Sequence, residues 1–280
     1  MERAFTGRHR DATFMTDHGF YVYGFAASET APDLLHPGHE EIGPVRMYEC
    51  GGLGAIASMV PPGMIEAGLS LEPPDPGWIV PRALHHEQVL RAAVQRTQVL
   101  PVRFGCVFAT EAALVEAIER HRTPIEDFLQ RMAGQEEWSL RVTLDEAQAV
   151  SFLLRCDPAL SARYRALPDA PGTRYFLEKK LGEEARRVAV RAGKTAAENV
   201  YRVLVGLATS IKALPLRAGE DGGRHPMLRL AVLLDRDGRE RMFAALDEAA
   251  TDRGVIPLCF DPAGPLPLYH FCPRLGEPVP

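Results

Sequence analysis

The chain carries the motif Leu84-His85-His86-Glu87-Gln88-Val89 and, ten residues on, Val99-Leu100-Pro101-Val102-Arg103-Phe104-Gly105. Pro81 precedes the first motif and favours the first turn of a helix, whereas the second motif is short and apolar around one arginine. We therefore predict a helix that leads into a short β-like segment. Polar side chains and an arginine at such a junction suggest an active site, an interpretation that the rest of the sequence must support or exclude.

The residues around these motifs predict a small unit of strands and helices. Residues 20–25 are aromatic and β-branched, as in a buried strand, and residues 45–50 and 53–60 are typical of a hairpin around a Gly-Gly turn. Residues 61–76 are rich in proline and are expected to form a loop. The helix that begins at Pro81 is expected to have one apolar face, made of Leu84, Leu90, Val94 and Thr97.

The second half of the chain predicts another sheet and a long helix. Residues 138–144 alternate apolar and polar side chains, which is typical of a half-buried strand, and residues 173–214 carry an apolar stripe at helical spacing. A strand, a helix and a last strand are expected over residues 227–235, 238–251 and 255–260. This order predicts a modified ferredoxin-like α+β fold with a long helical extension.

The predicted fold class is therefore α+β with two domains. Residues 1–18 show no periodicity and are expected to be a disordered extension. We assign residues 19–135 to an N-terminal α+β domain and residues 136–260 to the C-terminal ferredoxin-like domain with the long helix. Residues 261–280 form a proline-rich tail. The length of 280 residues suits two domains of medium size.

The composition is that of a globular protein and excludes several classes of function. Hydrophobic residues make up 46% of the chain and charged residues 25%, which provides for an ordinary core. The net charge of −5 argues against a nucleic-acid partner, because such a partner would need a basic face. The sequence has neither an apolar run long enough to span a membrane nor a signal-peptide core, so we expect an intracellular protein without a membrane partner.

The cysteines point to the same compartment. They are scattered, odd in number and never form a Cys-x-x-Cys pair, which is typical of reduced, mostly buried thiols in a cytoplasm. The five are Cys50, Cys106, Cys156, Cys259 and Cys272.

The histidines are candidates for a metal site, but their spacing is unsuitable. A zincin helix needs His-Glu-x-x-His, which places both imidazoles on one face, a turn apart. His85 and His86 are adjacent, and Glu87 has no second histidine one turn away. His36 and His39 lie in a predicted turn and would chelate only weakly. We therefore expect no metal and no cofactor, and a structural role for these residues.

Arg103 is the strongest single candidate for a functional residue. A guanidinium between Val102 and Phe104 is either exposed on the alternate face or buried against a carboxylate. An oxyanion-binding role is conceivable, but buried arginines are nearly always paired, so we expect a structural ion pair. The candidate partners are Glu87, Glu136 and Glu137.

The C-terminal tail combines prolines with apolar side chains. The prolines favour an extended backbone with few hydrogen-bond donors. Such a segment is either a strap packed across its own domain or a docking strand for a hydrophobic partner, and the two roles are compatible. The residues expected to bind a partner are Leu266, Leu268, Tyr269 and Phe271.

Four blocks of the sequence, in order, resemble a known family, the gas vesicle synthesis proteins of the L/F type. Residues 84–105 are similar to that family's His-Glu helix and its Leu-Pro-Val-Arg-Phe-Gly signature. Residues 134–142 look like its glycine, acidic pair and strand, residues 171–177 like the start of its long helix, and residues 264–271 like its Gly-Pro-x-Pro-Pro-Tyr-x-Phe tail. The likeness spans residues 19–272, nearly the whole chain.

The resemblance implies a minor gas vesicle protein. Such a protein would assist nucleation or assembly of the vesicle shell by binding the hydrophobic major shell protein and preventing its aggregation. The resemblance also implies other gas vesicle accessory proteins as partners, and a location at the gas vesicle or in the cytoplasm. Its signature residues are expected to be structural, namely His85, Glu87, Pro101, Arg103, Phe104 and Gly105.

Two other functions stay open at this point. One is a metal- or oxyanion-dependent enzyme centred on His85, Glu87 and Arg103, and the other is a small-molecule sensor built on the ferredoxin-like domain. The sequence contains no Gly-x-Ser-x-Gly elbow and no complete phosphate loop. We therefore expect a protein of the binding or assembly class and not an enzyme.

Overall fold

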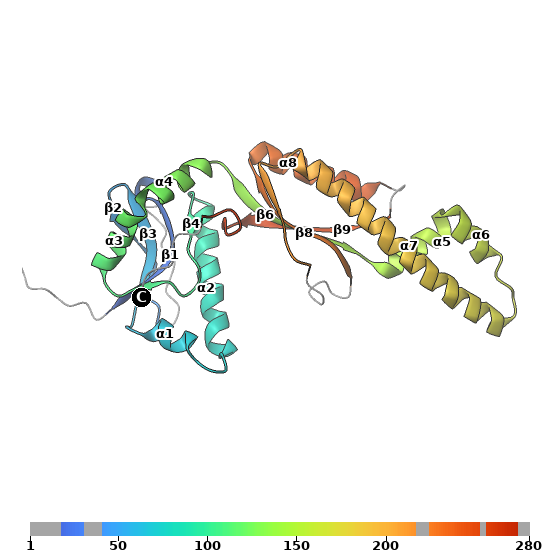
Figure 1. Ribbon diagram of the computed structural model, residues 1–280, viewed down its shortest axis with the longest axis horizontal. Helices are drawn as coiled ribbons and strands as arrows, with labels where there is room; N and C mark the ends of the chain where they lie inside the picture. Colours follow the sequence, from blue (N-terminus) through green and yellow to red (C-terminus); the bar gives the residue numbers. More distant parts are fainter. Residues whose placement is uncertain (1–17, 31–40, 217–223, 253–255, 274–280) are drawn as a thin grey trace, which may run out of the picture. The chain divides into compact units, whose positions relative to one another are not determined.

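The computed structural model describes residues 18–30, 41–216, 224–252 and 256–273 (Figure 1). The chain divides into two compact units, residues 1–126 and residues 127–280. Each unit combines helices with a sheet, which confirms the mixed α and β content that the sequence predicts. Most of the predicted N-terminal extension and the last residues of the predicted tail lie outside the described residues.

The N-terminal unit is built on an antiparallel sheet with strand order β2-β3-β1-β4, in which β5 also pairs with β1. The predicted hairpin is present as β2 and β3, and its turn uses two glycines with positive φ. The central strand β1 is buried along nearly its whole length. The strands are β1 (Gly19–Ala27), β2 (Arg46–Cys50), β3 (Leu53–Val60), β4 (Leu100–Pro101) and β5 (Val107–Phe108).

Two helices of this unit, α1 and α2, differ from the prediction. The proline-rich segment 61–76 is not wholly a loop, because it contains α1. The long helix α2 begins at Pro76 and not at Pro81, since the Asp75 side chain accepts a hydrogen bond from Gly77 N and caps the earlier turn. The described helices are α1 (Met64–Leu69), α2 (Pro76–Val94), α3 (Glu111–Arg120) and α4 (Arg122–Arg131), with a short 3-10 turn η1 (Ser28–Thr30).

The buried face of α2 agrees only in part with the predicted one, because Leu90 is buried as expected but Leu84 is not. Leu84, placed in the core by the sequence pattern, is 57% exposed. The buried side chains of this helix include both histidines of the motif. The buried residues of α2 are Arg82, His85, His86, Val89, Leu90 and Ala93.

The C-terminal unit contains a second antiparallel sheet with strand order β7-β8-β6-β9. Its chain order is a strand, three helices, two strands, a helix and a strand. The strands are β6 (Glu136–Leu144), β7 (Ser210–Ala213), β8 (His225–Leu234) and β9 (Cys259–Leu266). The helices are α5 (Glu146–Cys156), α6 (Pro158–Arg165), α7 (Pro171–Val205) and α8 (Arg236–Thr251).

The long helix α7 is shorter than predicted. It ends at Val205 and not at Leu214, because the chain after Gly206 turns into β7, where Ile211 pairs with Val232 of β8. Its buried face consists largely of small side chains, among them Ala185, Ala189 and Gly193. A Cβ on Gly193 would lie 3.1 Å from the end of the Met227 side chain, so small residues allow the helix to approach its neighbours closely. In Figure 1, α7 runs from the sheet of this unit to the α5–α6 pair.

The last strand also differs from the prediction. The sequence places it at residues 255–260, whereas β9 spans Cys259–Leu266 and so includes the first part of the predicted tail. Gly264 fits there because Trp138 packs over it, and a Cβ would lie 2.6 Å from the indole ring. All five cysteines are free, but none is fully buried, contrary to the expectation of mostly buried thiols. Among the described helices, none combines the length and apolar character needed to cross a membrane.

Candidate functional site

Two tyrosines of β1 and two histidines of α2 form a buried cluster in the N-terminal unit, which we call the Tyr–His cluster. Tyr21 and Tyr23 are two residues apart on β1 and project from the same side of the sheet. The Tyr21 hydroxyl lies 2.7 Å from Nδ1 of His86, and the Tyr23 hydroxyl lies 3.2 Å from Nε2 of His85. Ser58 of β3 lies 3.2 Å from the Tyr23 hydroxyl. All of these side chains are buried, so the histidines of the motif belong to the core.

His86 ties the helix to the segment that follows β4. Its Nε2 lies 3.1 Å from the carbonyl oxygen of Val102, which only accepts, so Nε2 carries the proton and donates. Nδ1 then accepts from the Tyr21 hydroxyl. Burial lowers the pKa of His86 from 6.5 to about 4; the Val102 hydrogen bond opposes this effect and the neighbouring His85 adds to it. His86 is therefore neutral at neutral pH and acts as a structural connector.

Three other signature residues have contacts of the same structural kind. Phe104 packs edge-on against Tyr21 and His86, with ring centroids 6.1 Å and 6.0 Å apart. Pro101 pairs with Gly24 across β1 and β4. Gly105 has φ +96°, a left-handed conformation that favours glycine, and a Cβ there would lie 2.8 Å from a Leu69 methyl group. These contacts support a structural role for the signature.

The predicted ion pair of Arg103 is not formed. Arg103 is exposed, and it has no ion pair or hydrogen bond within the part of the chain that the structure describes. The candidate carboxylates have other partners: Glu87 accepts from Arg91 at 2.8 Å, Glu136 accepts from Arg239 at 3.1 Å, and Glu137 lies 2.6 Å from His270. The sequence pattern missed this outcome because Arg103 lies beyond the end of β4, where strand alternation no longer determines which side chains are buried.

The enzyme centre suggested by the motif is not assembled either. His85 and Glu87 lie two residues apart on α2, about 200° around the helix, so they face different ways. His85 is buried against Tyr23, whereas Glu87 is half-exposed and pairs with Arg91. Over the described ranges, no group of three or more His, Cys, Asp or Glu side chains is arranged to hold a metal ion. His36 and His39 lie outside the described residues.

The tail after β9 packs against the C-terminal sheet; we call residues 267–272 the C-terminal strap. Glu137 of β6 is only 1% exposed and accepts two hydrogen bonds from His270, one from Nδ1 at 2.6 Å and one from the backbone N–H at 3.1 Å. Lys212 of β7 donates to the His270 carbonyl oxygen and lies 5.3 Å from the centre of the Phe271 ring. The buried Glu137 carboxyl group and the Lys212 side chain therefore hold the strap in place.

The structure of the strap contradicts the prediction for one of the partner-binding residues. Leu268 is 2% exposed and is part of the core, so it offers no surface to a partner. Leu266, Tyr269 and Phe271 are half-buried and keep part of their apolar surface accessible. Burial raises the pKa of Glu137 above its ordinary value of 4.5, while the hydrogen bonds and charge of His270 act in the opposite direction.

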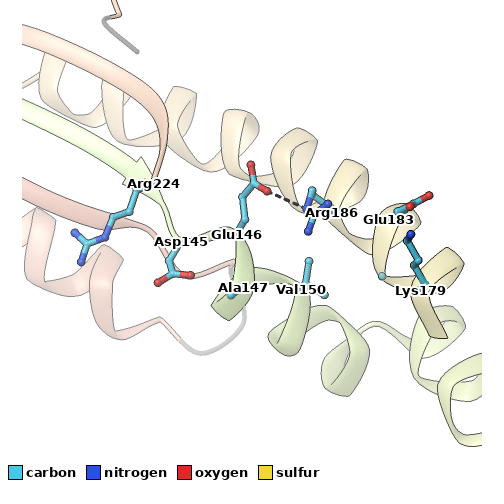
Figure 2. A pocket seen from close by; sticks show the side chains of 9 residues that line it. Asp145, Glu146, Ala147, Val150, Lys179, Glu183, Arg186 and Arg224 are labelled. Atoms are coloured by element: carbon cyan, nitrogen blue, oxygen red, sulfur yellow. Dashed lines mark ion pairs between the residues drawn. The ribbon is translucent and has the colours of Figure 1, made fainter. Parts of the chain in front are cut away.

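A polar groove opens beside the start of α5 and the first half of α7 (Figure 2). Glu146 lies in it and is already paired, with Arg186 Nε at 3.0 Å and with His225 Nδ1 at 3.2 Å. Lys179 and Arg224 line the same groove, as do Asp145 and other residues of both signs. Because the charges are mixed and partly paired with one another, the groove does not select a particular small molecule.

Each unit thus holds a few buried polar side chains by hydrogen bonds within its own sheet and helices, in an α+β fold. The sequence model of the family described as gas vesicle synthesis protein GvpL/GvpF matches residues 19–273. The chain therefore belongs to this family, which confirms the resemblance seen in the sequence and supports an accessory role in gas vesicles. One relative is gas vesicle protein F of Streptomyces sp. (strain CB03234), 26% identical over 253 residues, with 90% of this chain and 98% of the relative covered.

Other proteins with the same vesicle association are similar over nearly their full length. Gas vesicle protein L of the same Streptomyces strain is 27% identical over 272 residues, which cover 94% of this chain and 96% of the relative. The crystal structure of GvpF from Anabaena sp. PCC7120 has a TM-score of 0.63 at 15% identity, covering 94% of this chain and 99% of that chain. GvpF from Microcystis aeruginosa has a TM-score of 0.57 at 18% identity, with 91% and 99% covered. At these identities the structures show a shared fold.

Sequence reasoning missed the partners of the residues that it singled out. Tyr21 and Tyr23 were visible only as strand formers, and their spacing of two was the available sign that both face one helix. Glu137 was considered as a partner for an arginine, but its partner is His270, which lies 133 residues away in sequence. Glu137 alternates with the apolar residues of β6 in the same register as Ser139 and Arg141, so the strand pattern gave no sign of its burial.

Proposed function

We propose that this protein is an assembly factor of the gas vesicle. It binds the hydrophobic major shell protein before polymerisation, prevents its aggregation and so assists nucleation of the shell. The observation that carries this proposal is the family match over residues 19–273. A subunit that later lines a gas space exposes apolar surface beforehand, and a partner that covers this surface transiently keeps it from aggregating. The protein acts with other gas vesicle accessory proteins, at the vesicle or in the cytoplasm, and without nucleic acid or membrane.

The same proposal includes a non-catalytic mechanism that uses no cofactor. It is supported by the way in which both histidines of the motif are occupied by hydrogen bonds in the core. We also infer that the C-terminal unit is a modified ferredoxin-like domain, in support of which β6, β7, β8 and β9 form one antiparallel sheet in the order β7-β8-β6-β9. We keep residues 19–135 and 136–260 as the proposed domains, followed by the tail.

The proposed contact with the shell protein lies on the C-terminal strap and the adjoining end of β9. Leu266, Tyr269 and Phe271 contribute apolar surface there. The buried Glu137 and the Lys212 side chain fix the strap before any partner arrives, so little further ordering is needed on binding. Leu268 supports the strap from inside and does not touch the partner.

The test is co-expression of the shell protein with the full chain, followed by measurement of the soluble fraction of the shell protein. The wild-type chain is expected to raise this fraction, and Leu266→Ser combined with Phe271→Ser is expected to remove most of the gain. Leu84→Ser on α2 is the matched control, because that side chain is also apolar and more than half exposed. Circular dichroism and the melting temperature verify that each variant is folded.

The outcomes separate the parts of the proposal. A wild-type chain without effect on the soluble shell protein contradicts the assembly function. If the Leu266→Ser/Phe271→Ser variant is folded and still raises the soluble fraction as much as the wild type does, the contact with the shell protein does not lie on the strap. Retention of the effect in Leu84→Ser and its loss in the strap variant support both parts.

A further inference from the structure

The start of α7 carries a pair of aromatic side chains that the fold does not use. Tyr175 is 71% exposed and Phe176 is 67% exposed, and Leu177 beside them is also exposed. Every residue from 175 to 180 is exposed, which covers more than a full helical turn, and Leu181 is the next fully buried side chain. This end of α7 therefore projects from the α5–α6 pair; Figure 1 shows it at the end of α7 remote from the sheet of the same unit. We call residues 174–180 the α7 tip.

The α7 tip stands on a well-fixed base. Leu160 of α6 and Leu181 of α7 are both part of the hydrophobic core of this unit. Arg163 donates two hydrogen bonds to Glu184, at 2.7 Å and 2.8 Å, which joins α6 to α7 in a bidentate pair. The Tyr164 hydroxyl donates to Glu178 at 3.3 Å. The aromatic pair is thus presented in a set position, which lowers the entropic cost of binding.

The charge around the tip is opposite in sign to that of the whole chain. The chain has a net charge of −5. Between residues 164 and 180 the carboxylates are Asp169 and Glu178, whereas the cations are Arg165, Arg174, Lys179 and Lys180. The local surface is therefore basic next to two exposed aromatic rings.

From this combination we propose that the α7 tip is a docking site for an amphipathic protein helix whose polar face is acidic. The rings of Tyr175 and Phe176 cover its apolar face, and the flanking cations pair with its carboxylates. Exposed Tyr and Phe are effective anchors, because each buries a large area with few rotatable bonds. The surface is separate in sequence and structure from the C-terminal strap, and the proposal goes beyond binding of the shell protein.

A protein partner fits the tip better than an anionic membrane does. Asp169 and Glu178 lie among the cations and would be repelled by a uniformly negative surface, whereas a protein helix can place basic side chains opposite them. The fixed α6–α7 base also suits a partner with a defined helix face.

The test measures binding of two synthetic probe peptides to the full chain by fluorescence anisotropy. Both are amphipathic helices with a leucine face; the polar face of one is glutamate and that of the other is lysine. The glutamate peptide is expected to bind, and more weakly as salt is raised. Tyr175→Ser combined with Phe176→Ser is expected to raise its Kd about tenfold or more. Val203→Ser combined with Val205→Ser, at exposed sites on the same helix, is the matched control and should leave the Kd unchanged.

A second variant tests the role of charge without touching the rings. Arg174→Glu combined with Lys180→Glu is expected to weaken binding of the glutamate peptide and to strengthen binding of the lysine peptide. Equal binding of the glutamate peptide by the wild type and by the Tyr175→Ser/Phe176→Ser variant overturns the proposal. So does a wild-type chain that binds neither peptide but binds phosphatidylserine vesicles through the two rings, or one that self-associates through them in sedimentation.

These readouts do not depend on the proposed function. The peptides contain no shell-protein sequence. The result for the α7 tip is therefore independent of the measured soluble fraction of the shell protein. Conversely, loss of peptide binding in the tip variant leaves the strap experiment unaffected.

Discussion

The two units of this protein each bury a polar cluster, but they do so with opposite chemistry. The Tyr–His cluster of the N-terminal unit joins β1, β3 and α2 through hydroxyl groups and imidazoles, and its His86 is neutral at neutral pH. The cluster of the C-terminal unit centres on a carboxyl group, Glu137, which fixes the strap through His270. Burial penalises charge in both places, yet it lowers the pKa of His86 and raises that of Glu137.

The two clusters therefore respond to acid in opposite directions. His86 has a folded-state pKa below its unfolded value, so its contribution to stability is present above pH 6.5 and is lost as the pH falls towards about 4. Glu137 has a folded-state pKa above 4.5, so its contribution is present below that pH and is lost as the pH rises through the raised pKa. One chain thus contains two buried titratable groups, His86 and Glu137, that give opposite pH dependence of stability.

The positions of the two tryptophans make this comparison measurable in the full chain. Trp78 lies on α2 in the N-terminal unit and Trp138 lies on β6 in the C-terminal unit. In a Trp138→Phe background, fluorescence during urea unfolding reports the N-terminal unit, and in a Trp78→Phe background it reports the C-terminal unit.

The largest loss of unfolding free energy is expected from His86→Leu. The substitution removes the hydrogen bonds to Tyr21 and Val102 within a closed core. Loss of such bonds with a buried acceptor left behind costs about 3 to 4 kcal/mol. The Trp78 transition should shift to lower urea and the Trp138 transition should not. Gln88→Leu, at an exposed position of the same helix, is the control and should change neither. A stable His86→Leu variant would show that the cluster is not a structural connector.

Acidification should reproduce part of this effect in the wild-type chain. A pKa lowered from 6.5 to about 4 corresponds to about 3 kcal/mol of unfolding free energy lost between those pH values. We expect the free energy of unfolding read by Trp78 to fall in this window. The His86→Leu variant should lack that component, and an unchanged acid dependence in it would assign the titration to another group.

The Glu137→Gln variant tests the opposite sign in the C-terminal unit. Glutamine keeps the shape and can still accept from the His270 backbone N–H, so the cost is expected to be small, about 1 kcal/mol. As the pH is lowered through the raised pKa towards 4.5, the wild type gains the contribution of the protonated carboxyl and the variant does not. The stability difference in favour of the wild type, read by Trp138, should therefore grow on acidification. A difference that shrinks would mean that the ionised form is the favoured one.

Local pattern predicted most of the strands better than the limits of the two longest helices, α2 and α7, for a physical reason. Alternation and a Gly-Gly turn act over a few residues, so β3 and most of β1, β2 and β6 lie where the sequence predicts them. The start of α2 depends on which residue acts as its N-cap, here Asp75. The end of α7 depends on the pairing of β7 with β8, which involves residues outside the helix. The family signature named the right residues, but their partners come from strands that no local rule connects to them.

The smallest loss of stability is expected for Arg103→Ala, although the sequence pattern predicts a structural ion pair for this residue. Breaking a buried ion pair would cost about 3 kcal/mol or more, because a charge is left without its partner in the core. Arg103 is exposed instead, and the carboxylates proposed for it are occupied by Arg91, Arg239 and His270. Surface substitutions away from such contacts change stability by about 0.5 kcal/mol or less. Urea unfolding read by Trp78 should show this small change, with His86→Leu as the positive control in the same unit. A loss near that of His86→Leu would mean that Arg103 is held against a carboxylate in solution, whereas a folded variant that no longer raises the soluble shell protein would make Arg103 a contact residue for the partner.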